Sequence, residues 1–176
     1  MLVGRLLRGQ LVYETVNACI RLLASVHACH VVTVEYLRAI EDETSDNRPA
    51  AGADGCTVNS THLSKALHPV QQAMVDEHGS QCGFCTPGIV MSLYALWLNE
   101  SGPDEQTIKR NLQGNLCRCT GYAPIVRAAR NAARQDSRAK DRLFLNRQSV
   151  AAQLAQMETE EALYFSDGET LSLIHI

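Results

Sequence analysis

The chain has 176 residues, which is enough for one ordinary domain or two small ones. Its net charge is −3, and no block of basic residues or basic–aromatic stripe indicates binding to nucleic acid. No apolar run approaches the ~20 residues of a membrane-spanning helix, and the first residues lack the apolar core and cleavage site of a secretory signal. These features exclude nucleic acid and membrane as partners and predict a cytoplasmic location.

Residues 1–37 are predicted to be rich in β-strand. Short apolar runs are interrupted at residues 8–10, as in a hairpin, and the β-branched residues 31–34 predict a further strand. A hairpin with one additional strand buries too little apolar surface to be stable alone. We therefore expect these residues to be part of a domain rather than a whole one.

The character of the sequence changes over residues 38–66. This stretch includes EDETSDNRPAAGADG, which is polar, acidic and rich in Pro, Gly, Asp and Asn. Such a composition predicts a flexible linker or an insertion.

Residues 67–135 predict four short helices. Prolines and acidic residues mark the predicted helix starts, at Pro69, Pro87, residues 101–105 and Pro124. Thr86 is the predicted N-cap of the second helix, which is strongly apolar. Beyond residue 135 the sequence is mixed and polar, with one amphipathic helix expected around residues 149–162.

Seven cysteines are spread along the chain: Cys19, Cys29, Cys56, Cys82, Cys85, Cys117 and Cys119. An odd number of cysteines in a chain expected to be cytosolic argues against a disulfide framework. The last four form two tight pairs, in QCGFCTPG and CRCTGY, which favours a metal site with extra thiols.

Each cysteine pair is followed by a threonine and by a predicted helix that opens with a proline. The start of a helix presents unpaired N–H groups and the positive end of the helix dipole, so it favours anions. Four thiolates around iron and sulfide form an anionic assembly, which nearby N–H donors stabilise. Gly83 allows the backbone to bend closely around the sulfurs.

Three other interpretations of the four cysteines compete with an iron–sulfur site. Structural zinc also accepts four cysteines, but its usual spacing is C-x₂₋₄-C, whereas the second pair is C-x-C. A thioredoxin-like dithiol requires a βαβ setting, which is absent around this CxxC. Buried cysteines without a ligand are the remaining alternative.

The motifs QCGFCTPG and NLCRCTGY resemble those of the iron–sulfur subunit in the molybdenum hydroxylase family of xanthine dehydrogenases and aldehyde oxidases. The resemblance covers residues 67–129. It implies a mainly α fold, in which a four-helix [2Fe–2S]-binding bundle follows part of a β-grasp, plant-type ferredoxin-like domain. It also implies that Gln81 contacts the molybdenum cofactor. The cluster ligands implied by the resemblance are Cys82, Cys85, Cys117 and Cys119.

Residues 1–37 resemble the second half of the ferredoxin-type domain, and the resemblance makes Cys19 the orphan fourth ligand of a first cluster. The other three ligands of that cluster are absent, so we expect a chain that is truncated at its N-terminus and carries one cluster. By the same resemblance, residues 136–170 are a linker toward a missing FAD domain. Residues 171–176 resemble a translated sequencing adapter and are expected to be an artefact.

The resemblance implies electron transfer within an oxidoreductase, from a molybdopterin-binding partner subunit through [2Fe–2S] toward FAD and NAD. No residue has the character of a general base or a nucleophile, so catalysis is expected on the partner. The alternative is a zinc-stabilised helical module for protein interaction, without redox activity.

Overall fold

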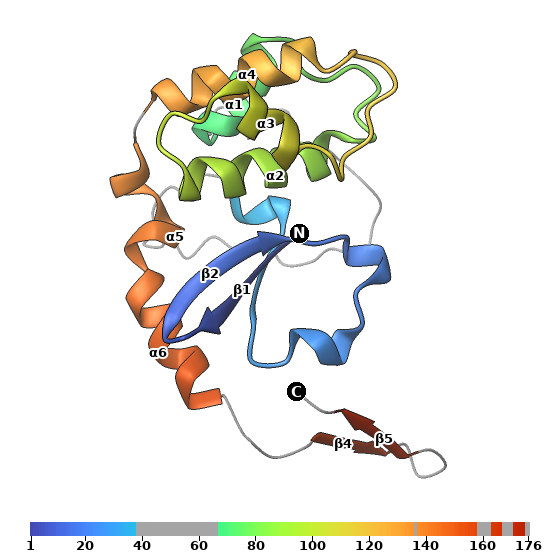
Figure 1. Ribbon diagram of the computed structural model, residues 1–176, viewed down its shortest axis with the longest axis vertical. Helices are drawn as coiled ribbons and strands as arrows, with labels where there is room; N and C mark the ends of the chain where they lie inside the picture. The colour runs from blue at the N-terminus through green and yellow to red at the C-terminus, as the bar shows by residue number, and fades with distance from the viewer. Residues whose placement is uncertain (38–66, 136, 158–162, 167–170, 175–176) are drawn as a thin grey trace, which may run out of the picture.

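The computed structural model describes residues 1–37, 67–135, 137–157, 163–166 and 171–174. The expectations for residues 38–66, including Cys56, lie outside the described residues. Helices form the upper part of the molecule in Figure 1, and a small sheet lies below them. The expected combination of a helix-rich region and a short β region is therefore confirmed.

The sheet has three antiparallel strands in the order β2-β1-β3. β1 (Leu2–Leu7) and β2 (Gln10–Thr15) form the predicted hairpin, and β3 (His30–Val32) pairs with the other side of β1. Arg8 and Gly9 both have positive φ, at 52° and 77°, as a tight two-residue hairpin turn requires. The third strand is shorter than predicted, because a 3₁₀ turn, η3 (Val34–Leu37), begins two residues after it.

Two short 3₁₀ helices, η1 (Ala18–Ile20) and η2 (Leu23–Val26), connect β2 to β3.

The helical region contains α1 (Pro69–Asp76), α2 (Thr86–Asn99), α3 (Glu105–Asn111) and α4 (Ala123–Arg134). α2 is central: every residue from Ile89 to Leu98 is buried. α1, α3 and α4 each pack against α2, and α4 also packs against α1 and α3. This explains why the α2 sequence is apolar all round, whereas α4 alternates buried and exposed positions.

Local signals account for most helix starts. His68 forms a capping box with Gln71 at the start of α1, and Asp104 accepts a hydrogen bond from the Thr107 N–H at the start of α3. The prediction that Thr86 caps α2 is wrong. The carbonyl of Cys85 already accepts the first helical hydrogen bond, from Ile89, so Cys85 is the N-cap and Thr86 is the first helical residue.

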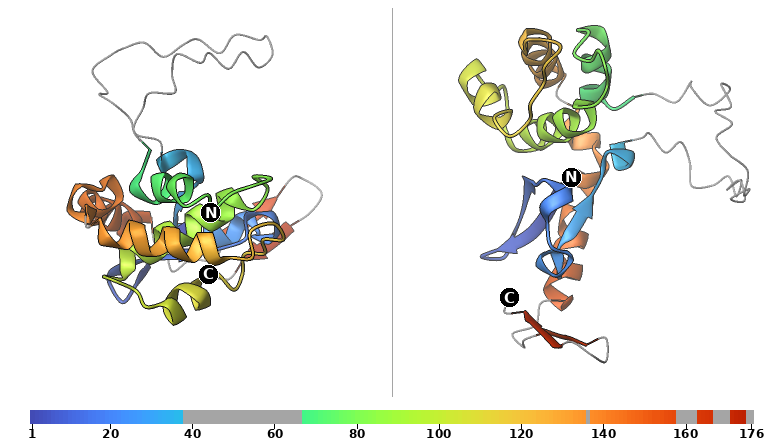
Figure 2. Two further views of the ribbon diagram at one scale, coloured as in Figure 1. Left: turned by 90° about the horizontal axis from the view of Figure 1, so that it is seen from above. Right: turned by 90° about the vertical axis from the view of Figure 1, so that its right-hand side faces the viewer.

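The region after α4 has more structure than the single helix expected there. A 3₁₀ turn, η5 (Arg138–Lys140), leads into α5 (Arg142–Leu145) and α6 (Arg147–Met157). α6 runs alongside the sheet in Figures 1 and 2 and packs against β1 and β2. Arg147 donates a 2.7 Å hydrogen bond to the Leu11 carbonyl, which attaches the start of α6 to β2.

An antiparallel pair of strands, β4 (Leu163–Ser166) and β5 (Leu171–Ile174), lies beyond α6. β5 falls within the residues expected to be an artefact, and its backbone pairs with β4. None of the described helices is long and apolar enough to cross a membrane.

One hydrophobic core joins these parts. Buried side chains of the sheet, of α1–α4, of α5 and of α6 belong to a single cluster, which includes Leu11, Tyr94, Ile125, Leu143 and Leu154. Two helices therefore contact the sheet. α2 packs against β2, and α6, in the tail of the chain, packs against β1 and β2. This packing fixes the sheet relative to the helices that position the cysteines.

Candidate metal centre

The two cysteine loops lie side by side at one end of the helical region. Cys82 and Cys85 precede α2, and Cys117 and Cys119 precede α4. The two loops meet at the ends of these helices in Figures 1 and 2. Both helices therefore begin at the end of the helical region where the cysteines lie, and the positive ends of their dipoles are at this end.

The first sulfur pair joins the two loops. The thiol of Cys119 donates to Sγ of Cys82 across 3.6 Å. The pKa of Cys82 is lowered, first by the backbone N–H of Phe84 and then by this contact. The same contact raises the pKa of Cys119, because its thiol is the donor. Of these two thiols, Cys82 is therefore the one that loses its proton more readily.

The second sulfur pair consists of Cys85 and Cys117, which are joined by a side-chain hydrogen bond. Burial and this contact raise the pKa of Cys85 to about 11. The hydroxyl and backbone N–H of Thr120 lower the pKa of Cys117 to about 7. In each pair, therefore, one thiol has a lowered pKa and its partner has a raised pKa.

The geometry of the sulfurs distinguishes types of metal site. Two sulfurs on one tetrahedral ion with ~2.3 Å bonds lie ~3.8 Å apart, and Cys82 and Cys119 are 3.6 Å apart. Among the residues that the structure describes, no group of three or more Cys, His, Asp or Glu converges on a point that could hold one ion. Two separate pairs suit two irons better than a single zinc, so the residues present fit a [2Fe–2S] cluster.

Backbone conformation shapes both loops. Gly83 has φ of +84°, which places the Phe84 N–H beside Cys82. Gly121 and Tyr122 have φ of +64° and +66° in succession, and this left-handed turn leads directly into α4. Gly121 adopts this conformation without steric cost, whereas Tyr122 requires support from its surroundings.

Hydrogen bonds anchor the second loop to the core. The Tyr122 hydroxyl accepts from the Cys117 N–H at 2.8 Å and donates to the Asn115 carbonyl at 2.9 Å. The Asn115 side-chain amide donates to Oγ of Ser92 at 2.7 Å, and Ser92 is buried in α2. A Cβ at Gly88 would lie 2.9 Å from Oδ1 of Asn115, so the loop and α2 approach closely there.

The remaining predicted site residues lie elsewhere. Gln81 is exposed beside Cys82. Cys19 is an exposed free thiol in η1, where it lines a hollow of about 440 Å³ with Gly88 and Asn115. Cys29 is half-buried, and its thiol donates a hydrogen bond to the His27 carbonyl.

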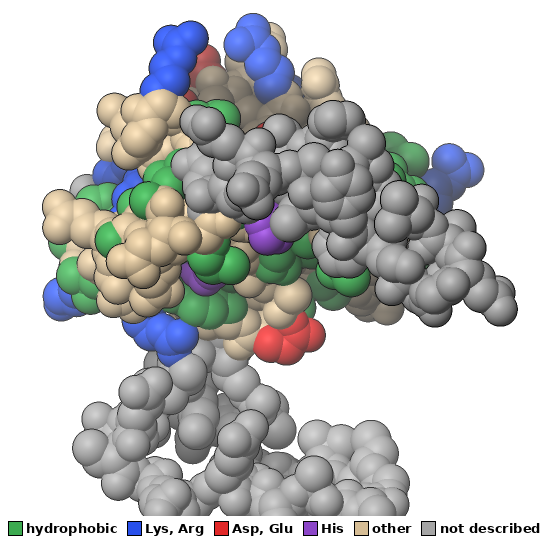
Figure 3. Space-filling model, turned by 90° about the horizontal axis from the view of Figure 1, so that it is seen from below, with side chains coloured by type: hydrophobic (Ala, Val, Ile, Leu, Met, Phe, Trp, Pro, Cys, Tyr) green, Lys and Arg blue, Asp and Glu red, His purple; other side chains and the backbone are tan. Residues whose placement is uncertain are grey.

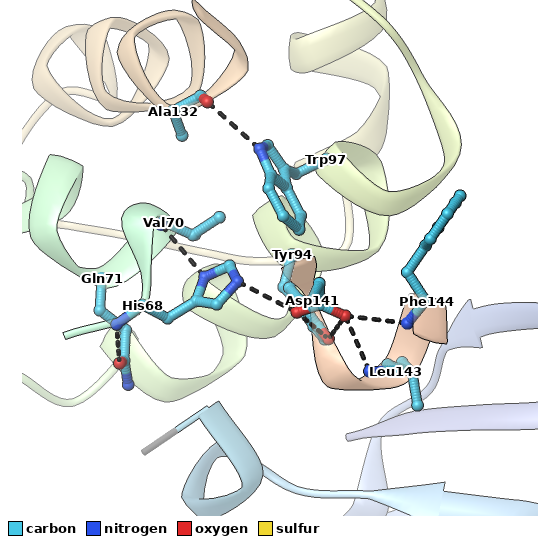
Figure 4. Close-up of polar contacts among 9 residues, drawn as sticks. All are labelled: His68, Val70, Gln71, Tyr94, Trp97, Ala132, Asp141, Leu143 and Phe144. Atoms are coloured by element: carbon cyan, nitrogen blue, oxygen red, sulfur yellow. Dashed lines mark hydrogen bonds and ion pairs between the residues drawn. The ribbon is translucent and has the colours of Figure 1, made fainter. Parts of the chain in front are cut away.

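Sequence reasoning missed a buried polar cluster that ties the tail to the helices. His68, Tyr94 and Asp141 meet between α1, α2 and the start of α5, as Figure 4 shows. Nothing in the sequence marks His68 for a specific role, because the histidines of the chain form no ligand-spaced set. No sequence signal connects His68 with a carboxylate more than seventy positions away.

The comparisons with known proteins point to an iron–sulfur domain. Residues 57–130 match the family described as [2Fe–2S] binding domain. This match supports the predicted cofactor, a [2Fe–2S] cluster.

Individual relatives allow a more specific comparison. It is 40% identical over 143 residues to xanthine dehydrogenase 1 of Arabidopsis thaliana, a match covering 81% of this chain and 8% of that protein. It is 42% identical over 128 residues to the xanthine dehydrogenase/oxidase of Mus musculus, a match covering 73% of this chain and 8% of that protein. The solved structure of the aldehyde oxidoreductase of Desulfovibrio desulfuricans is also similar, with 43% identity and a TM-score of 0.38. The match covers 39% of this chain and 8% of that chain. The resemblance to this group of oxidoreductases is confirmed, and the chain spans 8% of the length of these relatives.

Proposed function

We propose that Cys82, Cys85, Cys117 and Cys119 hold the [2Fe–2S] cluster and that the chain is an electron relay. In this proposal, electrons arrive from a molybdopterin centre on a partner and leave toward FAD and NAD. The observation that carries it is the pairing of each sulfur in the first loop with a sulfur in the second, at two helix starts. When bound, the cluster supplies one-electron transfer.

The residues of the chain have distinct roles in this relay. The four thiolates hold the cluster. Helices α1–α4 are proposed to form the family's four-helix bundle, and their packing keeps the two cysteine loops next to each other. Backbone N–H groups at the starts of α2 and α4 offset the negative charge that reduction adds.

Exposed apolar side chains beside the cysteines support docking of a partner at this end. Phe84 is 93% exposed and Leu116 is 85% exposed, and each directly neighbours a proposed ligand. Large apolar residues rarely remain so exposed without a partner to cover them. Gln81, exposed on the same loop, is proposed to contact the molybdenum cofactor of that partner.

Cys19 is proposed to lie on the side of the helical region from which electrons leave the cluster. It lines the same hollow as Asn115, the residue that anchors the second cysteine loop. A ferredoxin-type cluster held partly by Cys19 would therefore lie next to the helical region. A cytoplasmic location is proposed as well, because the six cysteines that the structure describes are all free thiols.

Anaerobic reconstitution of the full chain with iron and sulfide tests the proposal. We expect two irons and two sulfides per chain and an EPR signal after one-electron reduction. Cys85→Ser should abolish the signal, whereas the matched control Cys29→Ser should retain it. A colourless protein that keeps one zinc would instead establish the alternative, an interaction module without redox activity.

A further inference from the structure

Two threonines occupy equivalent positions in the cysteine motifs, but the structure gives them different partners. Thr86 directly follows Cys85, and Thr120 directly follows Cys119. The Thr86 hydroxyl lies 2.6 Å from Oγ of Ser80. The Thr120 hydroxyl lies 3.1 Å from Sγ of Cys117. Of these two threonine hydroxyls, the one in the second loop therefore contacts a cysteine sulfur, and the one in the first loop contacts a serine.

The direction of the Thr120 hydrogen bond follows from counting donors. The backbone N–H of Tyr122 donates to Oγ1 of Thr120 at 3.3 Å, so that oxygen already acts as an acceptor. A cysteine that binds iron is a thiolate and has no proton to donate. The hydroxyl proton of Thr120 is therefore the one directed at the Cys117 sulfur.

The surroundings of Thr120 hold this hydrogen bond in place. Tyr122 fixes the turn on one side through its N–H, and its hydroxyl holds the Cys117 N–H on the other. Asn115 continues the support to the buried Ser92. Because both the threonine and the cysteine are anchored to the same network, the hydroxyl is pre-oriented toward the sulfur before any charge arrives.

We propose that Thr120 acts through Cys117 to raise the reduction potential of the cluster, an inference that rests on the proposed ligand set. With the cluster bound, one-electron reduction would add one negative charge, which the ligand sulfurs would share. A hydrogen bond to a sulfur stabilises this more negative state more than the oxidised one. The proton remains on Thr120, so no bond breaks and no proton accompanies the electron.

The test is a redox titration of the reconstituted full chain, followed by EPR with dithionite as the reductant. Thr120→Val removes the hydroxyl at nearly constant shape, and we expect its midpoint potential to be more negative than that of the unsubstituted protein. Thr120→Ser keeps the hydroxyl and should restore the original potential. Thr86→Val is the matched control, because its hydroxyl contacts Ser80 rather than a sulfur, and it should leave the potential unchanged.

Iron and sulfide counts separate the failure of this inference from that of the proposed function. An unsubstituted chain without a cluster overturns the proposed function, and this inference with it. A fully loaded Thr120→Val protein with the original potential overturns only the role of Thr120, as does an equal shift in Thr86→Val. If Thr120→Val does not bind a cluster, Thr120→Ala removes the same hydroxyl without a β-branched side chain. Its midpoint potential is then compared with that of the unsubstituted protein in the same way.

Discussion

Nε2 of His68 lies 3.4 Å from Oδ2 of Asp141, and this contact joins the start of α1 to the start of α5. Nδ1 of His68 accepts from the Val70 N–H, so the ring proton is on Nε2 and is directed at the carboxylate. The Tyr94 hydroxyl also donates to Asp141, at 3.0 Å. The aromatic rings of His68, Tyr94 and Trp97 pack against one another around this contact, as Figure 4 shows.

Asp141→Ala is expected to destabilise the fold. Its side chain is 6% exposed, caps α5 through the Leu143 and Phe144 N–H groups, and accepts from Tyr94. Loss of the cap and of the acceptor for a buried hydroxyl should lower the free energy of unfolding by about 2–4 kcal/mol. Urea denaturation measures this. Asp76→Ala, which removes an exposed contact with Gln72, is the control and should change stability little.

The stability contributed by Asp141 should depend on pH. Burial alone would raise the pKa of Asp141, but hydrogen bonds from His68, the Phe144 N–H and Tyr94 outweigh burial and lower it. A lowered pKa means that the folded state resists protonation more than the unfolded state does. The contribution is therefore fully present above the unfolded value of 3.8 and is lost as pH falls through the folded pKa.

Comparison of the unsubstituted protein with Asp141→Asn across pH checks this dependence. The difference in the free energy of unfolding should be largest near neutral pH and should shrink below about pH 4. An equal difference at pH 7 and pH 3 would show that the charge of Asp141 is not what stabilises the junction.

Gly88→Ala should disturb the metal centre more than the fold. The added methyl would lie 2.9 Å from Oδ1 of Asn115 and would push that side chain away from Ser92. Loss of one hydrogen bond costs about 1 kcal/mol, but alanine gains about 1 kcal/mol over glycine in a helix. We therefore expect a nearly unchanged thermal midpoint with a lower iron content after reconstitution.

Gly114→Ala is the matched control for Gly88→Ala, because a Cβ there meets nothing within 4 Å. It should bind as much iron as the unsubstituted protein. Equal iron contents in both variants would contradict the role assigned to the contact between α2 and Asn115.

Leu154→Ala tests whether α6 completes the core of the sheet. Leu154 is 5% exposed on α6, which packs against β1 and β2. A cavity at this position should cost about 2–3 kcal/mol and should speed hydrogen exchange in β1. Leu145→Ala is the control, since Leu145 is 63% exposed. Unchanged exchange in β1 after Leu154→Ala would mean that the sheet does not depend on α6.

The lower face of the molecule is not uniformly polar. In Figure 3, hydrophobic side chains lie in the centre of this face, and Lys and Arg side chains lie around it. Exposed apolar residues among those that the structure describes include Ile20, Leu22 and Leu23, near Cys19. These side chains form an exposed apolar stretch of the chain directly after Cys19.

The hairpin and the helix starts follow from short-range physics that the sequence displays directly. Gly9 in a two-residue turn predicts β1 and β2, and Pro69, Asp104 and Pro124 each mark a helix start within one or two residues. The misplaced cap at Thr86 shows the limit of this reasoning. Which residue caps a helix depends on the hydrogen bonds of the preceding turn, and here the turn from Gly83 to Thr86 starts the helix early.

By itself, the sequence determined the cysteine motifs, the helices that follow them and the resemblance that they carry, because each depends on residues close together in the chain. Only the tertiary structure decided that Cys82 pairs with Cys119, that Thr120 rather than Thr86 reaches a sulfur, and that His68 meets Asp141. Those contacts depend on how α2, α4 and the tail pack around one core. Packing of that kind is set by many weak long-range contacts together, and no short motif encodes it.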